Sequence, residues 1–513
     1  MAFQCSAHQM TDAPPVLPEG VTAATFATAL ADFRRVVGSD QVLSDPADVA
    51  PYGRVLMPVP EEEHMPSAVV MPVTVEQIKG ILAVCNRTKV PVWTISTGRN
   101  FGYGSSAPAT RGQVVLDLRR MNRILEVDAE LGTALVEPGV TYQQLQDYLK
   151  ERNIPLWLDF PAPGPLVGPV GNTLERGGGL TPYGDHFQNS CGMEVVLADG
   201  TVVRTGLGEV QGARCWQVYK YGFGPYTDGI FTQSNFGVVT KLGMWLMPAP
   251  PAHRTILAQW WRDEDIGAAI DAIRPLRLDG TIPNFGVLAN ATLIMTSLAT
   301  RADVYTGHGA IPVEVANAAA KAKGLPPWLY AFTLYGRKER IESDTAVVKQ
   351  ALERSGATLI LDAHDPMQVN ELSLQTFSLF NWTSGGGLCW FSPVSPTRGA
   401  DVVKQTQLAR SIMNDHGVDF MTGMTINGRE ILNVMPIVFD RSDPEATQRV
   451  RTCFGKLLVA FAAQGYGIYR TGIGFMDEVA RLNGAGNQEL ARRLKRALDP
   501  NAILAPGKSG IRI

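Results

Sequence analysis

Two dense groups of glycines constrain the fold of this chain more than any other feature. The first is Thr97-Gly98-Arg99-Asn100-Phe101-Gly102-Tyr103-Gly104, and the second runs from Gly168-Pro169-Val170-Gly171-Asn172 to Arg176-Gly177-Gly178-Gly179. Glycine lets backbone N–H groups approach a ligand closely, and consecutive N–H groups bind phosphate oxygens. Together the two segments predict a bound dinucleotide, although each taken alone also fits ordinary tight turns.

Length and composition exclude several classes of protein. At 513 residues we expect two domains or interleaved lobes, and the net charge of −3 gives no reason to expect nucleic-acid binding. No apolar run is long enough to span a bilayer, and residues 1–15 lack the pattern of a signal peptide. We therefore expect neither a membrane nor a nucleic-acid partner and a cytoplasmic location, with export to the periplasm beside a signal-bearing partner as the alternative.

The cysteines and histidines argue against a metal. The six cysteines form no C-x-x-C pair, and the seven histidines show no H-E-x-x-H spacing. The sequence therefore predicts reduced thiols and no metal site. The absence of C-x-x-C-H also means that this chain carries no attached haem.

The known nucleotide fingerprints fit poorly, whereas the local pattern is clear. Gly98, Gly102 and Gly104 lack the Rossmann spacing, and Pro506-Gly507-Lys508-Ser509 has Ala502 where a P-loop needs its first glycine. The segment Val69–Leu118 nevertheless predicts a β-α-β unit, with a helix capped by Thr74 and a strand that leads into the first glycine group. A second unit follows, with a helix capped by Thr141. Helices are also expected over residues 266–276, 343–355 and 490–498.

Further motifs, spread over the chain, accompany the two glycine groups. They are Thr181-Pro182-Tyr183-Gly184-Asp185-His186, Phe231-Thr232-Gln233-Ser234-Asn235-Phe236-Gly237, Asn381-Trp382, Phe391-Ser392-Pro393-Val394, Gly465-Tyr466-Gly467-Ile468-Tyr469-Arg470 and Ile503-Leu504-Ala505-Pro506-Gly507-Lys508-Ser509-Gly510. In this order they resemble the vanillyl-alcohol oxidase / p-cresol methylhydroxylase flavoprotein family, over roughly Val69 to Ile513.

The resemblance implies an α+β fold with a two-lobed FAD-binding domain and an α+β cap domain. We place the FAD-binding domain at residues 1–246, completed by 465–513, and the cap at residues 247–464. The prolines at 248, 250 and 251 mark the boundary between them.

The same resemblance assigns the cofactor site. FAD would lie extended, with its pyrophosphate wrapped by the first glycine group. The implied cofactor-binding residues are Ser96, Thr97, Gly98, Arg99, Asn100, Gly102, Pro169, Gly171, Asn172, Gly237 and Arg470. Within this set, Pro169 is expected near flavin C4a and Arg470 at the N1/C2 edge.

The substrate class that the family implies is a para-substituted phenol. Bound as phenolate, it would release hydride from the benzylic carbon to flavin N5, and water would add to the resulting quinone methide. Tyr103, Tyr469 and Lys508 stand at the positions that bind the phenolate oxygen, and with Arg470 they form the expected catalytic set. Lysine replaces the family's arginine at position 508, which keeps the charge but loses the planar fork.

Two departures from the family alter the expected chemistry. Phe380 and Leu388 occupy the positions of the tyrosine and histidine that bind FAD covalently, so we expect non-covalent FAD. Cys389 lies beside Leu388, but alternation along a strand turns it to the other face. Thr376, Gly423, Leu432 and Pro436 replace acidic or basic side chains, and the family's flavin-side aspartate falls near Pro163.

These replacements predict a roomier, drier pocket for a phenol bulkier than cresol, such as an allyl- or propenyl-phenol or a lignan, and no general base for water addition is carried over. The expected pocket residues are Phe380, Leu388, Gly423, Thr425, Leu432 and Pro436.

The electron acceptor and the assembly stay open at this stage. The resemblance favours a dehydrogenase that passes electrons to a small c-type cytochrome subunit, and a homodimer of the flavoprotein chain. An oxygen-using oxidase is the alternative. A flavin-binding subunit without turnover, or an oxidase of sugars or hydroxyacids with the same fold, are further possibilities.

Overall fold

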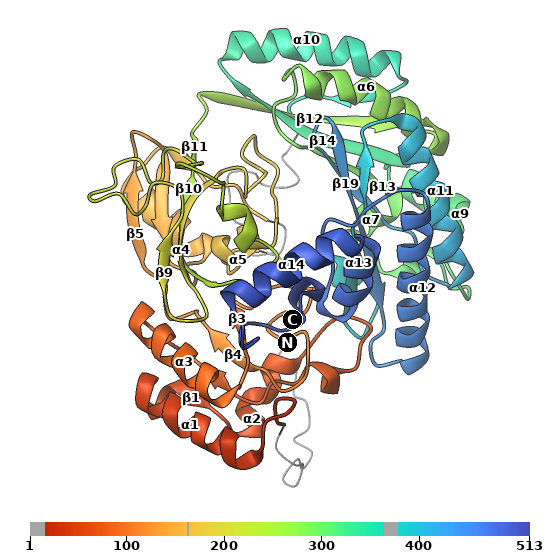
Figure 1. Cartoon of the computed structure of the whole chain (residues 1–513). Coiled ribbons are helices and arrows are strands. Elements are labelled where there is room, and N and C mark those ends of the chain that lie inside the picture. The colour runs from red at the N-terminus through yellow and green to blue at the C-terminus, as the bar shows by residue number, and fades with distance from the viewer. Residues whose placement is uncertain (1–15, 162–163, 364–377) are drawn as a thin grey trace.

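The computed structural model describes residues 16–161, 164–363 and 378–513. Figure 1 shows two small lobes, in red and in orange to yellow, beside a larger region in green, cyan and blue. The N-terminal lobe (residues 16–121) holds the first predicted β-α-β unit. The second lobe (residues 122–248) holds the next unit, and the cap (residues 252–463) follows it in the chain.

The N-terminal lobe is a four-stranded sheet in the order β1-β2-β4-β3, in which β2, β4 and β3 run parallel. Its elements are α1 (Ala23–Val37), β1 (Val42–Leu43), α2 (Pro46–Val49), β2 (Val69–Val70), α3 (Val75–Thr88), β3 (Val92–Ile95) and β4 (Val114–Asp117). The side chain of Thr74 accepts the backbone N–H of Gln77, which confirms the predicted start of α3. The first glycine group follows directly after β3.

The second lobe is a five-stranded antiparallel sheet in the order β5-β6-β10-β8-β9. Its elements are β5 (Ile124–Asp128), β6 (Thr133–Val136), α4 (Tyr142–Glu151), β7 (Leu156–Trp157), α5 (Pro169–Leu174), β8 (Ser190–Val196), β9 (Val202–Arg204), β10 (Val238–Trp245) and β11 (Met247–Pro248). Thr141 caps α4 through the N–H of Gln144, as predicted. The second glycine group contains α5 and the loop after it.

The cap is built on an antiparallel sheet in the order β15-β12-β14-β13-β18-β19-β16, with β17 paired to β19. Its strands are β12 (Ala252–Trp260), β13 (Val287–Asn290), β14 (Trp328–Gly336), β15 (Thr358–Ile360), β16 (Gly387–Phe391), β17 (Val394–Pro396), β18 (Gly423–Ile426) and β19 (Glu430–Phe439). Its helices are α6 (Ile266–Leu278), α7 (Ala291–Met295), α8 (Arg301–Val304), α9 (Val313–Ala322), α10 (Lys338–Arg354), α11 (Gly399–Asp415) and α12 (Pro444–Ala463).

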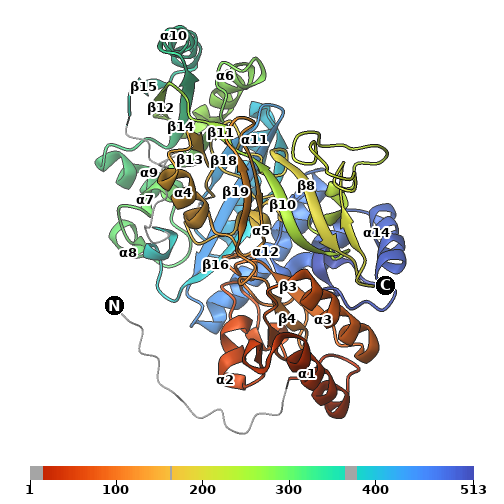
Figure 2. The ribbon, with the colours of Figure 1, turned by 90° about the vertical axis from the view of Figure 1, so that its left-hand side faces the viewer.

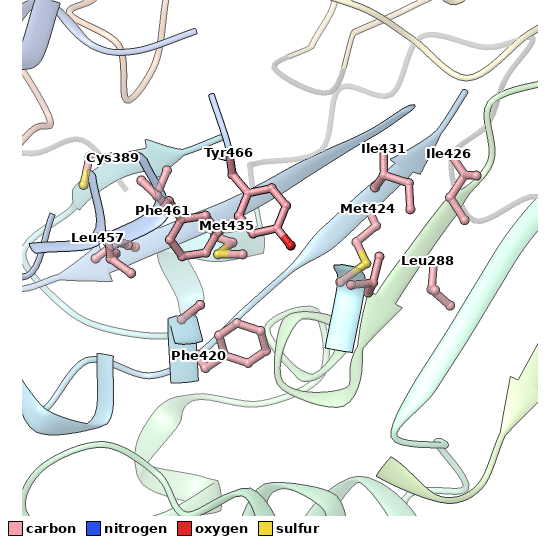
Figure 3. Close-up of a cluster of buried hydrophobic side chains, with 14 of the residues drawn as sticks. Leu288, Cys389, Phe420, Met424, Ile426, Ile431, Met435, Leu457, Phe461 and Tyr466 are labelled. Carbon is pink, nitrogen blue, oxygen red and sulfur yellow. The ribbon is translucent and has the colours of Figure 1, made fainter. Parts of the chain in front are cut away.

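The main core of the cap lies on one face of this sheet. Alternate residues of β19, among them Ile431 and Met435, pack there with side chains of α6, α10, α11 and α12. Figure 3 shows Cys389 of β16 in the same cluster, beside Leu457 and Phe461. The prediction that Cys389 turns away from Leu388 is therefore confirmed. The opposite face of β18 and β19 is turned toward the two lobes.

The C-terminal tail returns to the two lobes. Helices α13 (Met476–Leu482) and α14 (Ala485–Leu498), in dark blue, lie between the cap and the lobes in Figure 1. The backbone of Val92 in β3 pairs with the tail at Leu504. The side chains of Lys495 and Asp499 form a fully buried ion pair of 2.6 Å, and Lys495 also donates to the carbonyl of Asn235 at 2.8 Å. The exact domain boundaries stay predictions.

Figure 2 views the molecule from the side and shows the N-terminal lobe below the second lobe and the cap. None of the helices described is long and apolar enough to cross a membrane. In the same residues, no group of three or more His, Cys, Asp or Glu side chains is placed to hold a metal ion.

Candidate active site

A cavity of about 940 Å³ lies where the two lobes, the cap and the C-terminal tail meet. Its lining comes from the first glycine group, the second glycine group, the loop before β10, the strands β13, β18 and β19, and the tail. Cavities of this size hold cofactors and drug-sized ligands. All four predicted catalytic residues line it: Tyr103, Tyr469, Arg470 and Lys508.

The first glycine group forms a wall of exposed backbone. Residues 96–101 line the cavity directly after β3 ends. Gly98 has φ of +69°, and a Cβ there would lie 2.2 Å from the Ser106 hydroxyl, so the turn requires glycine. Of the predicted cofactor residues, Ser96, Thr97, Gly98, Arg99 and Asn100 lie in this wall.

The second glycine group packs against the first. The N–H of Gly168 donates to the Thr97 hydroxyl at 3.0 Å, and a Cβ on Gly171 would lie 2.2 Å from the Ser96 hydroxyl. Asn172 lines the cavity, and its side-chain oxygen lies 2.5 Å from Nδ1 of His186. The other ring nitrogen of His186 lies 2.9 Å from buried Asp159. This network holds the second wall segment in place.

The loop before β10 and the tail complete the cofactor wall. Gly237 and Asn235 both line the cavity. The side-chain amide of Asn235 donates to the carbonyls of Ala505 and Ile511 at 3.0 and 3.1 Å, which ties the tail to this loop. The Phe231–Gly237 motif therefore holds the C-terminal tail against the cavity wall.

Two predicted cofactor residues lie outside the described lining. Gly102 has φ of +74° and faces Trp390, because a Cβ there would lie 2.4 Å from the indole nitrogen. Pro169 is buried as the first residue of α5, and its neighbours Gly168 and Val170 face the cavity instead. The sequence identified the correct segments but not which of their residues face inward.

The two predicted tyrosines meet. The Tyr469 hydroxyl hydrogen-bonds to Tyr103, while the Tyr103 hydroxyl lies 3.3 Å from the hydroxyl of buried Ser392. Burial and the adjacent Tyr103 raise the pKa of Tyr469 above its usual value, against the opposing effect of Arg470. The Arg470 guanidinium lies 4.1 Å from the centre of the Tyr103 ring and hydrogen-bonds to Asn100. The Tyr469 hydroxyl therefore stays protonated, and able to donate a hydrogen bond, at neutral pH.

Lys508 lines the same cavity but already has a partner. Its ammonium forms an ion pair with the carboxylate of Glu175, and it lies 5.4 Å from the centre of the Trp93 ring. The sequence analysis missed Glu175, which directly follows α5 within the second glycine group. The only signal available was an acidic residue inside a segment expected to bind an anion.

The cap supplies the other side of the cavity. Gly423, Thr425 and Leu432 line it, as predicted, together with Val434, Asn427 and Glu430. The sequence prediction also placed Phe380, Leu388 and Pro436 in the pocket, but they are not among the described lining residues. Leu388 is fully buried in a second cap cluster that includes Leu379 and Trp382, and Phe380 packs against that cluster. Pro436 is buried opposite Trp390 in the β16–β19 ladder.

Trp390 is the main aromatic residue that the sequence analysis missed. It lines the cavity, stacks on Tyr103 with ring centres 6.2 Å apart, and donates its indole N–H to the carbonyl of Phe101 at 2.9 Å. Its position two residues after Leu388 on one face of β16 was the available signal. Thr376 and Pro163, also singled out from the sequence, lie outside the described residues.

The chain itself indicates that an anionic, hydrogen-bonding cofactor fits here. Among the described residues that line the cavity, three have a buried polar atom without a protein hydrogen-bond partner: Nε of Arg470, Oδ1 of Asn235 and Oδ1 of Asn427. Buried polar atoms in native proteins are nearly always satisfied. With the glycine backbone and the adjacent tyrosines, these atoms fit the site of a flavin-dependent oxidoreductase.

Comparison with known proteins agrees with this class. Residues 66–206 match the FAD binding domain family, and residues 264–509 match the C-terminal domain of FAD linked oxidases. The chain is 44% identical to the 4-cresol dehydrogenase [hydroxylating] flavoprotein subunit of Pseudomonas putida, over 97% of this chain and 98% of that protein.

Two solved structures are also similar. The crystal structure of p-cresol methylhydroxylase with substrate bound has a TM-score of 0.95 at 44% identity, covering 97% of this chain and 99% of that one. The 4-ethylphenol oxidase from Gulosibacter chungangensis, in complex with isoeugenol, has a TM-score of 0.93 at 33% identity, covering 96% and 99%. The chain belongs to the vanillyl-alcohol oxidase / p-cresol methylhydroxylase flavoprotein family and is an FAD-dependent oxidoreductase.

Proposed function

We propose that the protein oxidises para-substituted phenols at the benzylic carbon and hydroxylates that carbon with water. The observation that carries the proposal is the hydrogen-bonded pair of Tyr103 and Tyr469 in the wall that also holds the Lys508 ammonium. Ionising a phenol at neutral pH costs about 4 kcal/mol, because its pKa is near 10. Converging donors and a cation favour the charged form and offset that cost.

The residues of this chain would divide the work as follows. Tyr103 and Tyr469 donate hydrogen bonds to the phenolate oxygen, and Lys508 supplies positive charge beside it. Arg470, fixed by Asn100 and by the Tyr103 ring, would hold the cofactor edge. Bound FAD supplies the hydride acceptor. Loss of hydride converts the phenolate to a neutral quinone methide, to which water adds at the same carbon.

The direct test is anaerobic bleaching of the flavin by a panel of 4-alkylphenols. We expect rapid loss of the oxidised flavin absorbance with at least one of them and none with 4-bromophenol, which has no benzylic hydrogen. Protein that retains FAD but is bleached by no phenol would contradict the proposal and favour a flavin-binding subunit without turnover.

We propose a phenol larger than cresol as the substrate. Support comes from the cap wall, where Gly423 has no side chain and Thr425, Leu432 and Val434 are small or apolar. The oxidase relative was solved with isoeugenol, a propenyl-substituted phenol. Steady-state kinetics should give a higher kcat/KM for allyl- or propenyl-phenols than for p-cresol, and a clear preference for p-cresol would refute this assignment.

We propose that FAD is held without a covalent bond. Phe380 lacks the hydroxyl and Leu388 lacks any nucleophile at the family's attachment positions. No cysteine or histidine is among the described residues that line the cavity, and burial raises the pKa of the Cys389 thiol well above its usual value. Acid precipitation should leave the yellow colour in the supernatant, whereas a yellow pellet would show a covalent link.

We propose a small c-type cytochrome as electron acceptor and a homodimer of this chain as the assembly. Support comes from the relative at 44% identity, which is a flavoprotein subunit of a dehydrogenase. The relative at 33% identity is an oxidase, which keeps oxygen as the second candidate. Adding air to the anaerobically reduced protein separates the two, because reoxidation within milliseconds would indicate an oxidase.

A further inference from the structure

The ion pair between Lys508 and Glu175 lies inside the cavity rather than on the surface. Glu175 caps the C-terminal end of α5 and Lys508 begins the short helical turn η8 (Lys508–Gly510), so the two charges come from segments far apart in the chain. Their side chains are only 12% and 18% exposed. Among the residues that the structure describes, Glu175 is the acceptor of the Lys508 ammonium, and a bound phenolate would have to share that ammonium with it.

The backbone holds Glu175 in a fixed relation to the tyrosine pair. The side-chain amide of Gln233 donates to the carbonyl of Tyr469 at 3.0 Å and to the carbonyl of Glu175 at 3.4 Å. The N–H of Gln233 donates to the carbonyl of Leu174 at 2.8 Å. Because one side chain bonds to both carbonyls, it fixes the backbone of Glu175 relative to the backbone of Tyr469.

Two other cations of the cavity wall have uncharged partners. The Arg176 guanidinium donates to the Thr232 hydroxyl at 3.3 Å, and Arg470 hydrogen-bonds to Asn100. At Lys508, by contrast, a phenolate meets a cation whose charge a carboxylate already balances. Two anions around one ammonium repel each other, and this repulsion is strong where water is largely excluded.

We propose that Glu175 is the counter-ion that limits how tightly the site holds a phenolate, so that it sets the balance between binding the ionised and the neutral phenol. The inference rests on the proposed function, because it takes Lys508 as the cation for the phenolate oxygen. The carboxylate of Glu175 repels a phenolate bound to the same ammonium, and this repulsion weakens phenolate binding.

The test uses the FAD-loaded protein and 4-bromophenol as the probe. Ultraviolet difference spectra distinguish bound phenolate from bound phenol across a pH series, and titration gives the Kd. Glu175→Gln keeps an oxygen that can accept from Lys508 but removes the charge. We expect its Kd for the phenolate to fall about tenfold and the ionisation midpoint of the bound probe to fall by about one pH unit.

Two variants serve as matched controls. Glu175→Asp keeps the charge and should stay close to the wild-type values. Glu430→Gln removes the same charge from the cap wall of the same cavity, at a carboxylate that lies near Arg277 rather than Lys508, and should change the Kd less than twofold. Melting temperature and FAD content of each variant show whether it has folded.

Each other result overturns the inference. Weaker phenolate binding by Glu175→Gln would mean that Glu175 serves to hold Lys508 in place. An equal effect of Glu430→Gln would mean that only the net charge of the cavity matters. The proposed function fails separately if the wild type binds no phenolate, or if Lys508→Met leaves its Kd unchanged. In that case the proposed role of Glu175 is also refuted.

Discussion

The two walls of the cavity are built in different ways. The wall contributed by the lobes is largely backbone, with Gly168, Gly171 and residues 177–179 facing the cavity. The wall contributed by the cap consists of side chains that alternate along β18 and β19, such as Thr425, Leu432 and Val434. We therefore expect the lobe wall to bind the cofactor and the cap wall to contact the substrate.

This difference predicts how each wall responds to substitution. A side chain added to the lobe wall meets fixed backbone or buried polar groups, so the whole site should be lost. A side chain changed on the cap wall meets the cavity itself, so the choice of substrate should change while FAD binding persists. The tyrosines at the junction should affect catalysis without affecting either wall.

The largest effect is expected from Gly179→Ala in the lobe wall. The added Cβ would lie 1.3 Å from Oδ1 of Asp159 and 2.8 Å from the carbonyl of Phe160. Asp159 is buried and accepts the N–H of Thr181 at 2.6 Å, so displacing it leaves buried polar groups unpaired. We expect a loss of about 3 kcal/mol or more in the free energy of unfolding, together with loss of bound FAD.

Chemical denaturation and the ratio of flavin to protein absorbance measure both effects. Gly229→Ala is the matched control, because nothing lies within 4 Å of the Cβ it would add. If Gly179→Ala retained FAD and stability like this control, the lobe wall would not depend on its glycines.

The same distinction explains what could be predicted from the sequence. Local signals succeeded: Thr74 and Thr141 cap their helices, and alternation along β16 placed Cys389 in the core. Each of these depends on residues close together in the chain. The two glycine groups were informative for a similar reason, because a run of glycines indicates a backbone that turns tightly or lies close to another group.

Long-range pairings could not be obtained in this way. The partner of Lys508 lies 333 residues earlier in the chain, at Glu175. On β19, the alternation of side chains predicts which residues share the face turned toward the cavity. It does not predict how far along the strand the cavity extends. Leu432 and Val434 line the cavity, whereas Pro436, further along the same row, lies opposite Trp390 in the β16–β19 ladder and is not among the described lining residues. Packing between the lobes and the cap decides such questions.

Tyr469→Phe at the junction of the walls should give the second largest effect. It removes the hydroxyl that hydrogen-bonds to Tyr103 but keeps the ring. We expect kcat/KM for a 4-alkylphenol to fall about 100-fold, equivalent to about 2.7 kcal/mol of transition-state stabilisation, with FAD content unchanged.

Tyr466→Phe is the control for that variant. Its hydroxyl donates to Asp401 at 2.8 Å, and Figure 3 shows its ring in the core cluster of the cap beside Phe461. It should lose about 1 kcal/mol of stability and little activity. Equal kinetic losses in both variants would show that Tyr469 acts only through packing.

Gly423→Leu on the cap wall should change selectivity. A Cβ there would lie 3.2 Å from Leu293 and 3.6 Å from Val287, so the larger side chain must extend into the cavity. We expect kcat/KM for a propenyl-phenol to fall about 20-fold relative to p-cresol. Met424→Leu, on the next residue and the core face of β18, should leave that ratio unchanged. If the ratio of the two kcat/KM values changed equally in both variants, the cap wall would not determine substrate selectivity.

The smallest effect concerns pH and the sheet that supports the lobe wall. Burial acts to raise the pKa of Glu194 in β8, but hydrogen bonds from Lys241 at 2.8 Å and Arg204 at 3.0 Å outweigh it and lower the pKa. A lowered folded-state pKa contributes stability that is fully present above the unfolded value of about 4.3 and is lost as pH falls through the folded-state value.

Glu194→Gln should therefore cost about 1 kcal/mol at pH 7, and the difference from wild type should shrink as the pH falls below about 4. Urea unfolding at several pH values measures this difference. Glu126→Gln, at the exposed residue of strand β5 in the same sheet, should show no such pH dependence. FAD binds only the folded lobes. On acidification, the wild type should therefore release FAD at a higher pH than its stability at neutral pH would predict. If the stability difference between Glu194→Gln and wild type stayed constant with pH, Glu194 would contribute through packing and not through its charge.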